Sequence, residues 1–463
     1  MDFGCREMAV CAPCVKNSVA LWNLLLFYDG SANAWRRWHD NFPTNLTGSM
    51  LMFLISATTL RNSLTAFAVL ALMSLPLAAG DWPNWMGPRL DGNSSEAGWS
   101  EKWPEDGLPQ VWTAELGIGF SSVSVVDGLL YSMGHSDGKE SVWCLKASTG
   151  DKVWSHSYAA ELNPNLYEGG PGSTPTVDGD ALYTLSVDGR LLCLDRKDGN
   201  VRWERNLQQE FDVGLPEWGF NSSPLILADT VLIQGGRVGA FHRDSGAKIW
   251  QSEKHTPGYG SIRELKHDGK TFLASLDSDG VRICDATDGS QVAFEPWKSP
   301  FRTNSTTPII VSDSIYISSG YNVGCGLFQF DGRQLTQIYA NRHMRNHFSN
   351  SILFDGYLYG MDGNSNLGRV VTLTCMKYDT GEVIWKQRGL GCGSLMIADG
   401  KLLIQSETGD LVLAQATPEG YHEMARTTFL SDRCWTMPVL ANGRVYGRNA
   451  QGKLVCVKLP AVD

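Results

Sequence analysis

The 463-residue sequence has few charged residues and lacks clusters of positive charge. Asp, Glu, Lys and Arg together make up 19% of it, the formal net charge is −10, and the isoelectric point lies near 5.4. Proteins that bind nucleic-acid phosphates carry clustered Lys and Arg side chains. We therefore expect no nucleic-acid partner.

Several catalytic and metal-binding motifs are also missing. The sequence has no Gly-Xaa-Ser-Xaa-Gly elbow, no phosphate-binding loop and no zinc-protease helix. Its histidines are scattered, and only His343 and His347 lie close together. They fall in a stretch without the helical pattern that would put both rings on one face. No metal site is predicted.

The sequence does contain a repeat, with seven copies and a partial eighth copy between about residue 110 and the C-terminus. Its clearest copies place a tryptophan four residues after a turn glycine, as in Thr149-Gly150-Asp151-Lys152-Val153-Trp154 and Thr380-Gly381-Glu382-Val383-Ile384-Trp385. The turn glycines recur every 39 to 49 residues. That period is typical of a β-propeller.

Each copy divides into four short runs rich in β-branched, leucine and aromatic residues. Turns such as Asp127-Gly128 and Asp137-Gly138 separate the runs, and Asp-Gly supplies the positive φ angles that tight hairpins need. The fourth run carries the tryptophan. Four antiparallel strands per repeat make one propeller blade, so the sequence predicts an all-β fold.

The two ends of the repeat array indicate how the ring closes. The last copy, Thr436 to Leu459, has three strands and ends before a fourth, whereas Gln110-Val111-Trp112-Thr113 is a fourth strand without a preceding blade. If this N-terminal strand completes the last blade, no sheet edge stays open. We predict an eight-bladed propeller over residues 110–463, with seven blades as the alternative.

The N-terminal region has the pattern of an export signal. Arg61 precedes an apolar core, Leu64 to Met73, and the small residues Ala78-Ala79-Gly80 follow. The core is short for a membrane span, so we interpret residues 50–80 as a signal peptide, with an uncleaved anchor as the alternative. Residues 1–49 would then be an upstream extension before the true start. The predicted mature chain has no membrane span, and residues 81–109 form an N-terminal strap.

Six of the eight cysteines in the predicted mature chain fall into two groups. Cys144, Cys193, Cys375 and Cys456 occupy one position of the repeat, where other copies carry small residues, and this predicts buried packing groups. Cys392 and Cys434 instead precede the first strands of adjacent blades. A disulfide between Cys392 and Cys434 is a hypothesis from this placement.

The blade ending Leu-Xaa-Cys/Ala-Leu-Asp-Xaa-Xaa-Thr/Asp-Gly-Xaa-Xaa-Xaa-Trp resembles the tryptophan-docking repeat of the pyrroloquinoline quinone (PQQ) propeller superfamily. The resemblance covers about residues 105–459. It implies that the tryptophan of one blade packs against the next, a role that falls to Trp112, Trp154, Trp203, Trp250 and Trp385. Residues Asp81 to Gly92 resemble the leader of exported PQQ-like repeat proteins of planctomycete-type bacteria, and imply a strap whose tryptophans pack on the propeller.

Membership of that superfamily leaves the function open, since it includes enzymes and scaffolds. Its alcohol dehydrogenases hold PQQ between a tryptophan and a disulfide of neighbouring cysteines, beside a calcium ion. This sequence has no Cys-Cys pair, and no calcium-and-base set can be matched in it. Its length is closer to that of the outer-membrane assembly scaffold propeller. We expect no cofactor, with PQQ and calcium as the alternative.

Segments just before each first strand are expected to line one mouth of the central channel. Aromatic, arginine and amide side chains there would suit a planar anionic ligand, although they are also what a solvated channel mouth needs. The candidate ligand-binding residues are Glu168, Trp218, Asn221, Tyr259, Arg302, Asn304, Arg345, His347, Asn350, Arg433 and Trp435.

Two functional hypotheses follow. The first is an exported, non-catalytic module, periplasmic or extracellular, that binds a protein or polymer of the cell envelope through its mouth or rim and is a monomer. The second is a PQQ-dependent dehydrogenase of the alcohol or polyvinyl-alcohol type, for which Trp218 or Trp435 would have to supply the stacking platform.

Overall fold

The structure, a computed structural model, describes residues 80–165, 167–364 and 370–462. The predicted upstream extension 1–49 lies outside the described residues, and so does the predicted signal peptide 50–80 except for Gly80. Within the described residues almost all regular structure is β-strand, with one short α-helix, α4 (Leu207–Phe211), and one 3-10 turn, η1 (Pro300–Arg302). No helix within these described ranges is long and apolar enough to cross a membrane.

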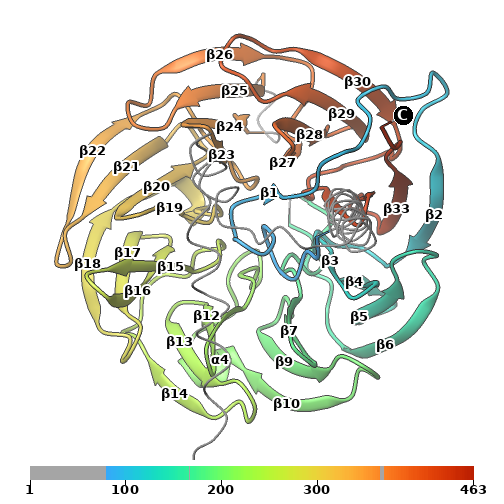
Figure 1. The fold of residues 1–463 in the computed structure, drawn as a ribbon. Helices are drawn as coiled ribbons and strands as arrows, with labels where there is room; N and C mark the ends of the chain where they lie inside the picture. The colour runs from blue at the N-terminus through green and yellow to red at the C-terminus, as the bar shows by residue number, and fades with distance from the viewer. Residues whose placement is uncertain (1–79, 166, 365–369, 463) are drawn as a thin grey trace, which may run out of the picture. The chain divides into compact units, whose positions relative to one another are not determined.

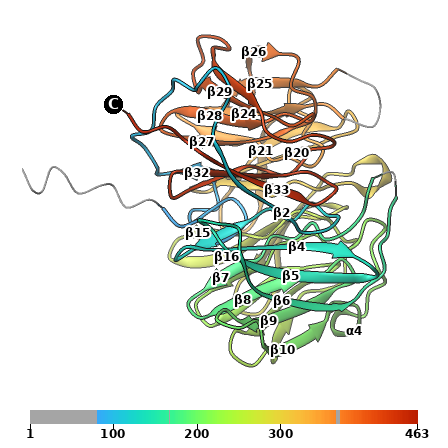
Figure 2. The same cartoon turned by 90° about the vertical axis from the view of Figure 1, so that its right-hand side faces the viewer.

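The strands form eight antiparallel sheets arranged around a central axis, which confirms the predicted eight-bladed propeller (Figure 1). Figure 2 shows the same ring from the side. Blades 1 and 2 contain β3 (Ser124–Val126), β4 (Leu129–Ser136), β5 (Lys139–Lys146), β6 (Lys152–Ala159), β7 (Thr176–Asp178), β8 (Ala181–Leu185), β9 (Arg190–Asp195) and β10 (Val201–Asn206).

Blades 3 to 5 repeat the same order of strands. They contain β11 (Leu225–Leu227), β12 (Thr230–Gln234), β13 (Val238–His242), β14 (Lys248–Gln251), β15 (Arg263–His267), β16 (Lys270–Leu276), β17 (Gly280–Asp285), β18 (Gln291–Pro296), β19 (Ile309–Val311), β20 (Ser314–Ser319), β21 (Gly324–Phe330) and β22 (Leu335–Asn341).

Blades 6 to 8 complete the ring. They contain β23 (Ile352–Phe354), β24 (Tyr357–Asp362), β25 (Thr372–Lys377), β26 (Val383–Gln387), β27 (Ser394–Ala398), β28 (Lys401–Gln405), β29 (Asp410–Gln415), β30 (Glu423–Thr428), β31 (Val439–Ala441), β32 (Arg444–Arg448) and β33 (Lys453–Lys458), together with the N-terminal β2 (Gln110–Glu115).

Strand β2 closes the ring as the sequence predicts. It pairs antiparallel with β33, so that Trp112 lies opposite Cys456 and Glu115 opposite Lys453. Blade 8 therefore takes its outer strand from the beginning of the propeller and its inner three strands from the end. Both ends of the array are fixed in one sheet, and no blade is left with three strands.

The blade tryptophans pack on the turn of the following blade. Trp112, Trp154 and Trp203 each donate a hydrogen bond from Nε1 to a backbone oxygen of the next blade, at 3.0, 3.0 and 2.8 Å. Each ring also lies so close to the turn glycine that a Cβ there would come within about 2.7 Å of it, as at Gly150 and Trp112. The turn glycine is therefore required both by its positive φ and by the tryptophan face.

The repeated cysteine position lies between two aromatic rings. In blade 1, Cys144 faces Tyr131 on one side and Trp154 on the other, and blade 2 repeats this with Tyr183, Cys193 and Trp203. Burial raises the pKa of the Cys144 thiol to about 11. A small, neutral side chain fits between the rings, which explains why alanine replaces cysteine in other blades.

Hydrogen bonds between side chains and backbone join neighbouring blades around the channel. The backbone N–H of Thr174 donates to Ser223 Oγ (2.9 Å), that of Ser223 to Ser261 Oγ (2.9 Å), and that of Ser261 to Thr307 Oγ1 (3.0 Å). Thr307 in turn donates from N–H to Asn350 Oδ1 (3.1 Å) and accepts Asn350 Nδ2 on its carbonyl oxygen (2.7 Å). We call these five residues the inner belt.

The strap, residues 81–109, crosses the centre of the ring at one end of the channel (Figure 1). Trp82 is buried and exchanges two backbone hydrogen bonds with Val125, at 2.7 and 2.8 Å. Strand β1 (Asn93–Ser94) pairs parallel with β27, and Glu96 accepts the backbone N–H groups of Asn442 and Gly443 in the β31–β32 turn. The strap thus covers the end of the channel where the first strands turn into the second strands.

Replacing a docking tryptophan should destabilise the whole ring. Trp203→Ala removes a buried indole and its bond to the Arg243 carbonyl, so we expect a loss of about 3 to 5 kcal/mol in the free energy of unfolding, measured by urea denaturation. Val201→Ala, an exposed position on the same strand, is the matched control and should change it by less than about 0.5 kcal/mol. Equal effects of the two variants would contradict the docking role.

Candidate functional site

A cavity of about 220 Å³ lies in the channel, on the inner side of the strap. Its walls come mainly from the segments through which the chain enters each first strand. Every blade contributes at least one side chain to it, and the strap contributes Trp85. The lining consists of aromatic, hydroxyl, amide and small residues: Trp85, Phe120, Asn165, Tyr167, Gly172, Trp218, Asn221, Ser223, Tyr259, Gly260, Ser261, Thr303, Ser305, Thr307, Tyr321, His347, Phe348, Ser394, Trp435, Thr436 and Met437.

Trp85 closes the cavity on the strap side. Its indole Nε1 donates to Thr307 Oγ1 at 3.3 Å, which ties the strap to the inner belt. Trp82 and Trp99 of the same segment are buried in the hydrophobic core instead. The strap therefore provides both packing and one wall of the site.

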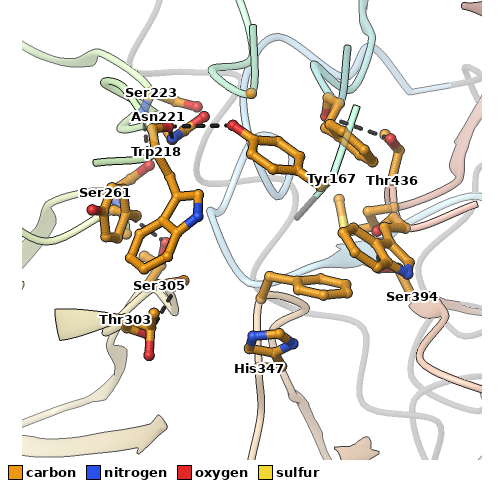
Figure 3. Close-up of a pocket in the computed structure, with 18 of the residues that line it drawn as sticks. Tyr167, Trp218, Asn221, Ser223, Ser261, Thr303, Ser305, His347, Ser394 and Thr436 are labelled. Carbon is orange, nitrogen blue, oxygen red and sulfur yellow. Dashed lines mark hydrogen bonds between the residues drawn. The ribbon is translucent and has the colours of Figure 1, made fainter. Parts of the chain in front are cut away.

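Aromatic rings surround the cavity (Figure 3). Trp435 lies 4.2 Å from Phe348 and 5.5 Å from Phe120 between ring centroids. Across the cavity, Trp218 meets Tyr259 edge-on at 5.8 Å. Tyr167 lies between the two groups, with its hydroxyl donating to the Trp218 carbonyl at 3.4 Å, and burial raises its pKa to about 12. These rings give a flat apolar ligand several faces on which to stack.

Charged groups stay outside the cavity lining, and those at its rim are bound to other protein groups. Among the described residues that line the cavity there is no Asp, Glu, Lys or Arg. Arg433 makes an ion pair with Glu168 at 2.8 Å and lies over the Trp435 ring, 4.4 Å from its centroid. Glu407 is held by the Trp435 indole, whose Nε1 donates to Oε1 at 3.0 Å. The cavity is consequently neutral.

His347 is the one histidine in the lining, and it is buried among rings. Tyr321 lies edge-on to it at 5.0 Å, and Phe348 lies 4.8 Å away. Its Nδ1 finds no hydrogen-bond partner among the described residues. Burial lowers the pKa of His347 to about 4, because the imidazolium would lose its hydration without gaining a counter-charge. His347 is therefore neutral at neutral pH.

The structure brings five of the predicted mouth residues to the cavity and places six elsewhere. Trp218, Asn221, Tyr259, His347 and Trp435 line it. Glu168 and Arg433 form the rim ion pair just described. Arg302 is exposed and outside the lining.

The three remaining predicted residues are bound to other parts of the protein. Asn304 is buried, with Nδ2 donating to the carbonyl oxygens of Asp277 and Trp297, both at 2.7 Å. Asn350 belongs to the inner belt. Arg345 makes a two-pronged ion pair with the buried Asp362, at 2.6 and 2.9 Å. Their polar groups are thus committed to protein partners rather than facing the cavity.

Sequence reasoning missed several lining residues. Phe120 and Phe348 stand in the same lead-in segments as the predicted residues, but phenylalanine carries no polar group that would indicate a ligand contact. Tyr321 comes from the β20–β21 turn, which lies outside those segments. The hydroxyls of the inner belt do have a sequence signal, since a serine or threonine recurs at or just before each first strand.

Cys392 and Cys434 are both buried, and the disulfide hypothesised between them stays a prediction. The backbone N–H groups of both residues bind Glu407, at 2.9 Å each, so the two segments do meet at the boundary between blades 7 and 8. The Cys434 Sγ contacts the carbonyl oxygens of Ser431 and Asp432 at 3.6 and 3.5 Å, and burial raises its pKa to about 12.

The fold and the repeat define an eight-bladed propeller of the PQQ-repeat type, with a neutral aromatic cavity at its channel mouth. The family model described as outer membrane protein assembly factor BamB matches residues 90–261 and 138–387, which is more than half of the chain. The chain belongs to this BamB-type family of PQQ-repeat propellers.

Individual relatives agree with this assignment. Outer membrane protein assembly factor BamB from Shewanella oneidensis is 21% identical over 386 residues, covering 76% of this chain and 90% of that protein. The crystal structure of BamB from Moraxella catarrhalis matches with a TM-score of 0.53 at 17% identity, covering 76% of this chain and 98% of that one.

An enzyme shares the fold as well. Quinohemoprotein alcohol dehydrogenase from Comamonas testosteroni matches with a TM-score of 0.60 at 12% identity, covering 83% of this chain and 81% of that one. At this identity the likeness concerns the fold alone.

The cavity does not fit PQQ with calcium. Calcium takes carboxylate and carbonyl oxygens, and the quinone's carboxylates need cationic partners. The lining includes the amide oxygens of Asn165 and Asn221, but it has no carboxylate for calcium and no cationic side chain for the quinone carboxylates. Within the described ranges no three His, Cys, Asp or Glu side chains come together as metal ligands would. The nearest guanidinium, that of Arg433, is already paired with Glu168.

Burial of His347 should make stability depend on pH. The folded pKa of about 4 lies below the unfolded value near 6.5, so as pH falls through this range the unfolded chain gains a proton and the folded chain does not. The free energy of unfolding should therefore be highest above about pH 6.5, and it should decrease by about 2 kcal/mol between pH 7 and pH 5. Urea denaturation of wild type and His347→Gln at both values measures it.

The difference between wild type and His347→Gln should therefore shrink or reverse at pH 5. His422→Gln, at an exposed position, is the matched control and should follow the wild type. A pH dependence identical in wild type and His347→Gln would show that His347 titrates like a solvated histidine.

Proposed function

We propose that the chain is an exported, non-catalytic binding module whose ligand enters the channel cavity at the mouth. The observation that supports this most directly is the cavity itself. Rings from Phe120, Tyr167, Trp218, Tyr259 and Trp435 converge on one space that is open at the rim. A concave apolar site with a few polar groups is the usual form of a binding pocket.

The chemistry of the lining supports binding rather than catalysis. A general acid or base must titrate near the working pH and reach the reacting group. His347, the lining residue nearest to that description, has a pKa of about 4 and is enclosed by rings. The carboxylates closest to the mouth, Glu168 and Glu407, are bound to Arg433 and to the Trp435 indole.

Similarity to outer membrane protein assembly factors supports a role in the cell envelope. For this chain we propose a protein or polymer partner there, with the chain acting as a monomer and without a cofactor. A stable, closed ring suits this role because its loops and channel are held rigidly, which lowers the entropy lost on binding.

Envelope binding should depend on the mouth. In co-sedimentation with isolated envelopes of the source cells, the purified chain should pellet, and Trp218→Ala/Trp435→Ala should reduce the bound fraction at least about tenfold. Tyr421→Ala changes a half-buried aromatic residue at the outer rim and should bind like the wild type. Equal binding by all three proteins would place the contact away from the cavity and contradict the proposal.

The quinoprotein alternative can be tested with the cofactor itself, because the binding-module proposal predicts no activity with PQQ. After incubation with PQQ and calcium, the wild-type chain should show no dye-linked oxidation of alcohols above that of the free cofactor, and its tryptophan fluorescence should not be quenched. The reason is the neutral lining, which leaves the quinone carboxylates unpaired. Saturable quenching lost in Trp435→Ala would instead support the dehydrogenase-like reading.

A further inference from the structure

The rings of the cavity continue without a gap to the protein surface. From Trp435 the path runs through Phe348 (4.2 Å) to His347 (4.8 Å), and from there through Tyr321 (5.0 Å) to Phe301 (5.3 Å). We call this run of five rings the aromatic path. Its first four members line the cavity, whereas Phe301 lies beyond it and is 66% exposed. The path leads from the cavity to solvent.

The exposure of Phe301 is maintained at a conformational cost. Phe301 and Arg302 both have positive φ, 61° and 57°, in the short η1 turn. Non-glycine residues seldom adopt this conformation, and it persists where the surroundings impose it, often at functional sites. The turn presents an apolar ring to water beside the cavity. A ligand longer than the cavity would cover that ring.

The wall of the cavity away from the path is rich in hydroxyl and amide groups. Ser223, Ser261 and Thr307 use their oxygen atoms to accept backbone N–H groups of the inner belt. A hydroxyl that accepts one bond still has its own hydrogen to donate. The cavity therefore combines flat apolar faces with hydroxyl donors and acceptors, all of them neutral.

A pyranose ring has the complementary surface, with C–H groups on its faces and hydroxyls around its edge. We propose that the ligand is a neutral polysaccharide whose terminal sugar occupies the cavity and whose next sugar lies on Tyr321 and Phe301. This inference rests on the proposed function and specifies its ligand. Because Trp85 closes the strap side, a linear polymer can insert only its end.

Electrostatics favours a neutral polymer over an acidic one. The cation nearest the stacking rings, Arg433, is neutralised by Glu168 at 2.8 Å. Arg302 beside Phe301 is exposed and outside the lining, where water and salt screen its charge. A carboxylate carried into the cavity would lose its hydration and find no counter-charge.

The test is binding of neutral pentasaccharides to the purified chain, measured by isothermal titration calorimetry. The probes are pentamers of β-linked glucose, β-linked mannose, β-linked N-acetylglucosamine and α-linked glucose, with a β-linked uronate pentamer as the charged comparison. We expect at least one neutral pentamer to bind with a Kd below about 1 mM, and the uronate pentamer to bind at least about tenfold more weakly.

Variants separate the two ends of the aromatic path. Trp435→Ala should weaken binding of both the pentamer and its monosaccharide, whereas Phe301→Ala should weaken only the pentamer, each by about tenfold. Phe301 is exposed, so its variant tests the path without disturbing the core. Tyr421→Ala is again the matched control and should bind both sugars like the wild type.

Three results would overturn the inference: no binding of any neutral pentamer at about 10 mM, equal or tighter binding of the uronate, or unchanged pentamer affinity in Phe301→Ala. Binding of a tryptophan-rich peptide with the same dependence on Trp435, in place of the sugars, would also overturn it. If envelope binding still required Trp218 and Trp435, the proposed function would stand and only the sugar would be wrong.

Discussion

Pairing of β2 with β33 is the interaction on which the rest of the structure depends. Five of the eight blades place a tryptophan on the turn of the blade that follows, which is a head-to-tail contact. Such contacts leave unsatisfied surfaces at both ends unless the ring closes. The β2 strand supplies Trp112, which lies on Gly150 of blade 1 and satisfies the last of them. Closure also fixes the number of blades in the ring and therefore the width of the central channel. The lead-in segments line one mouth of this channel.

The blades were predictable from the sequence because their strands pair locally. Asp-Gly turns and the alternation around Cys144 and Trp154 specify the register of each sheet, and the unpaired Gln110 to Thr113 run indicates the closure. The candidate site was predictable only in part. The position of a residue in the repeat predicts whether it comes near the mouth. It does not predict whether the polar group of that residue faces the cavity or binds another protein group.

Asn221 and Asn350 illustrate that limit. Both are asparagines before a first strand, yet Asn221 lines the cavity with its Nδ2 bound to the Trp218 carbonyl (2.8 Å), while Asn350 lies outside the lining and binds the Thr307 backbone through both Oδ1 and Nδ2. Similarly, Arg345 turns to Asp362, whose carboxylate comes from a strand seventeen residues further on. The partners that bind these side chains, Thr307 and Asp362, come from other segments of the chain. The sequence of one lead-in segment therefore does not identify them. The exposed Phe301 depends on backbone strain, which leaves even less trace in the sequence.

The same hydroxyl groups that join the blades also form one wall of the cavity. Ser261 accepts the Ser223 N–H, donates its own N–H to Thr307 Oγ1, and lines the space in which we place the ligand. Its geometry is therefore fixed by blade-to-blade contacts before any ligand arrives, and little order has to be gained on binding. The aromatic rings take less part in joining the blades, since Trp435 and Phe301 lie at the mouth and rim rather than in the belt. Ligand preference can consequently change through the rings while the belt keeps blades 2 to 6 joined around the cavity.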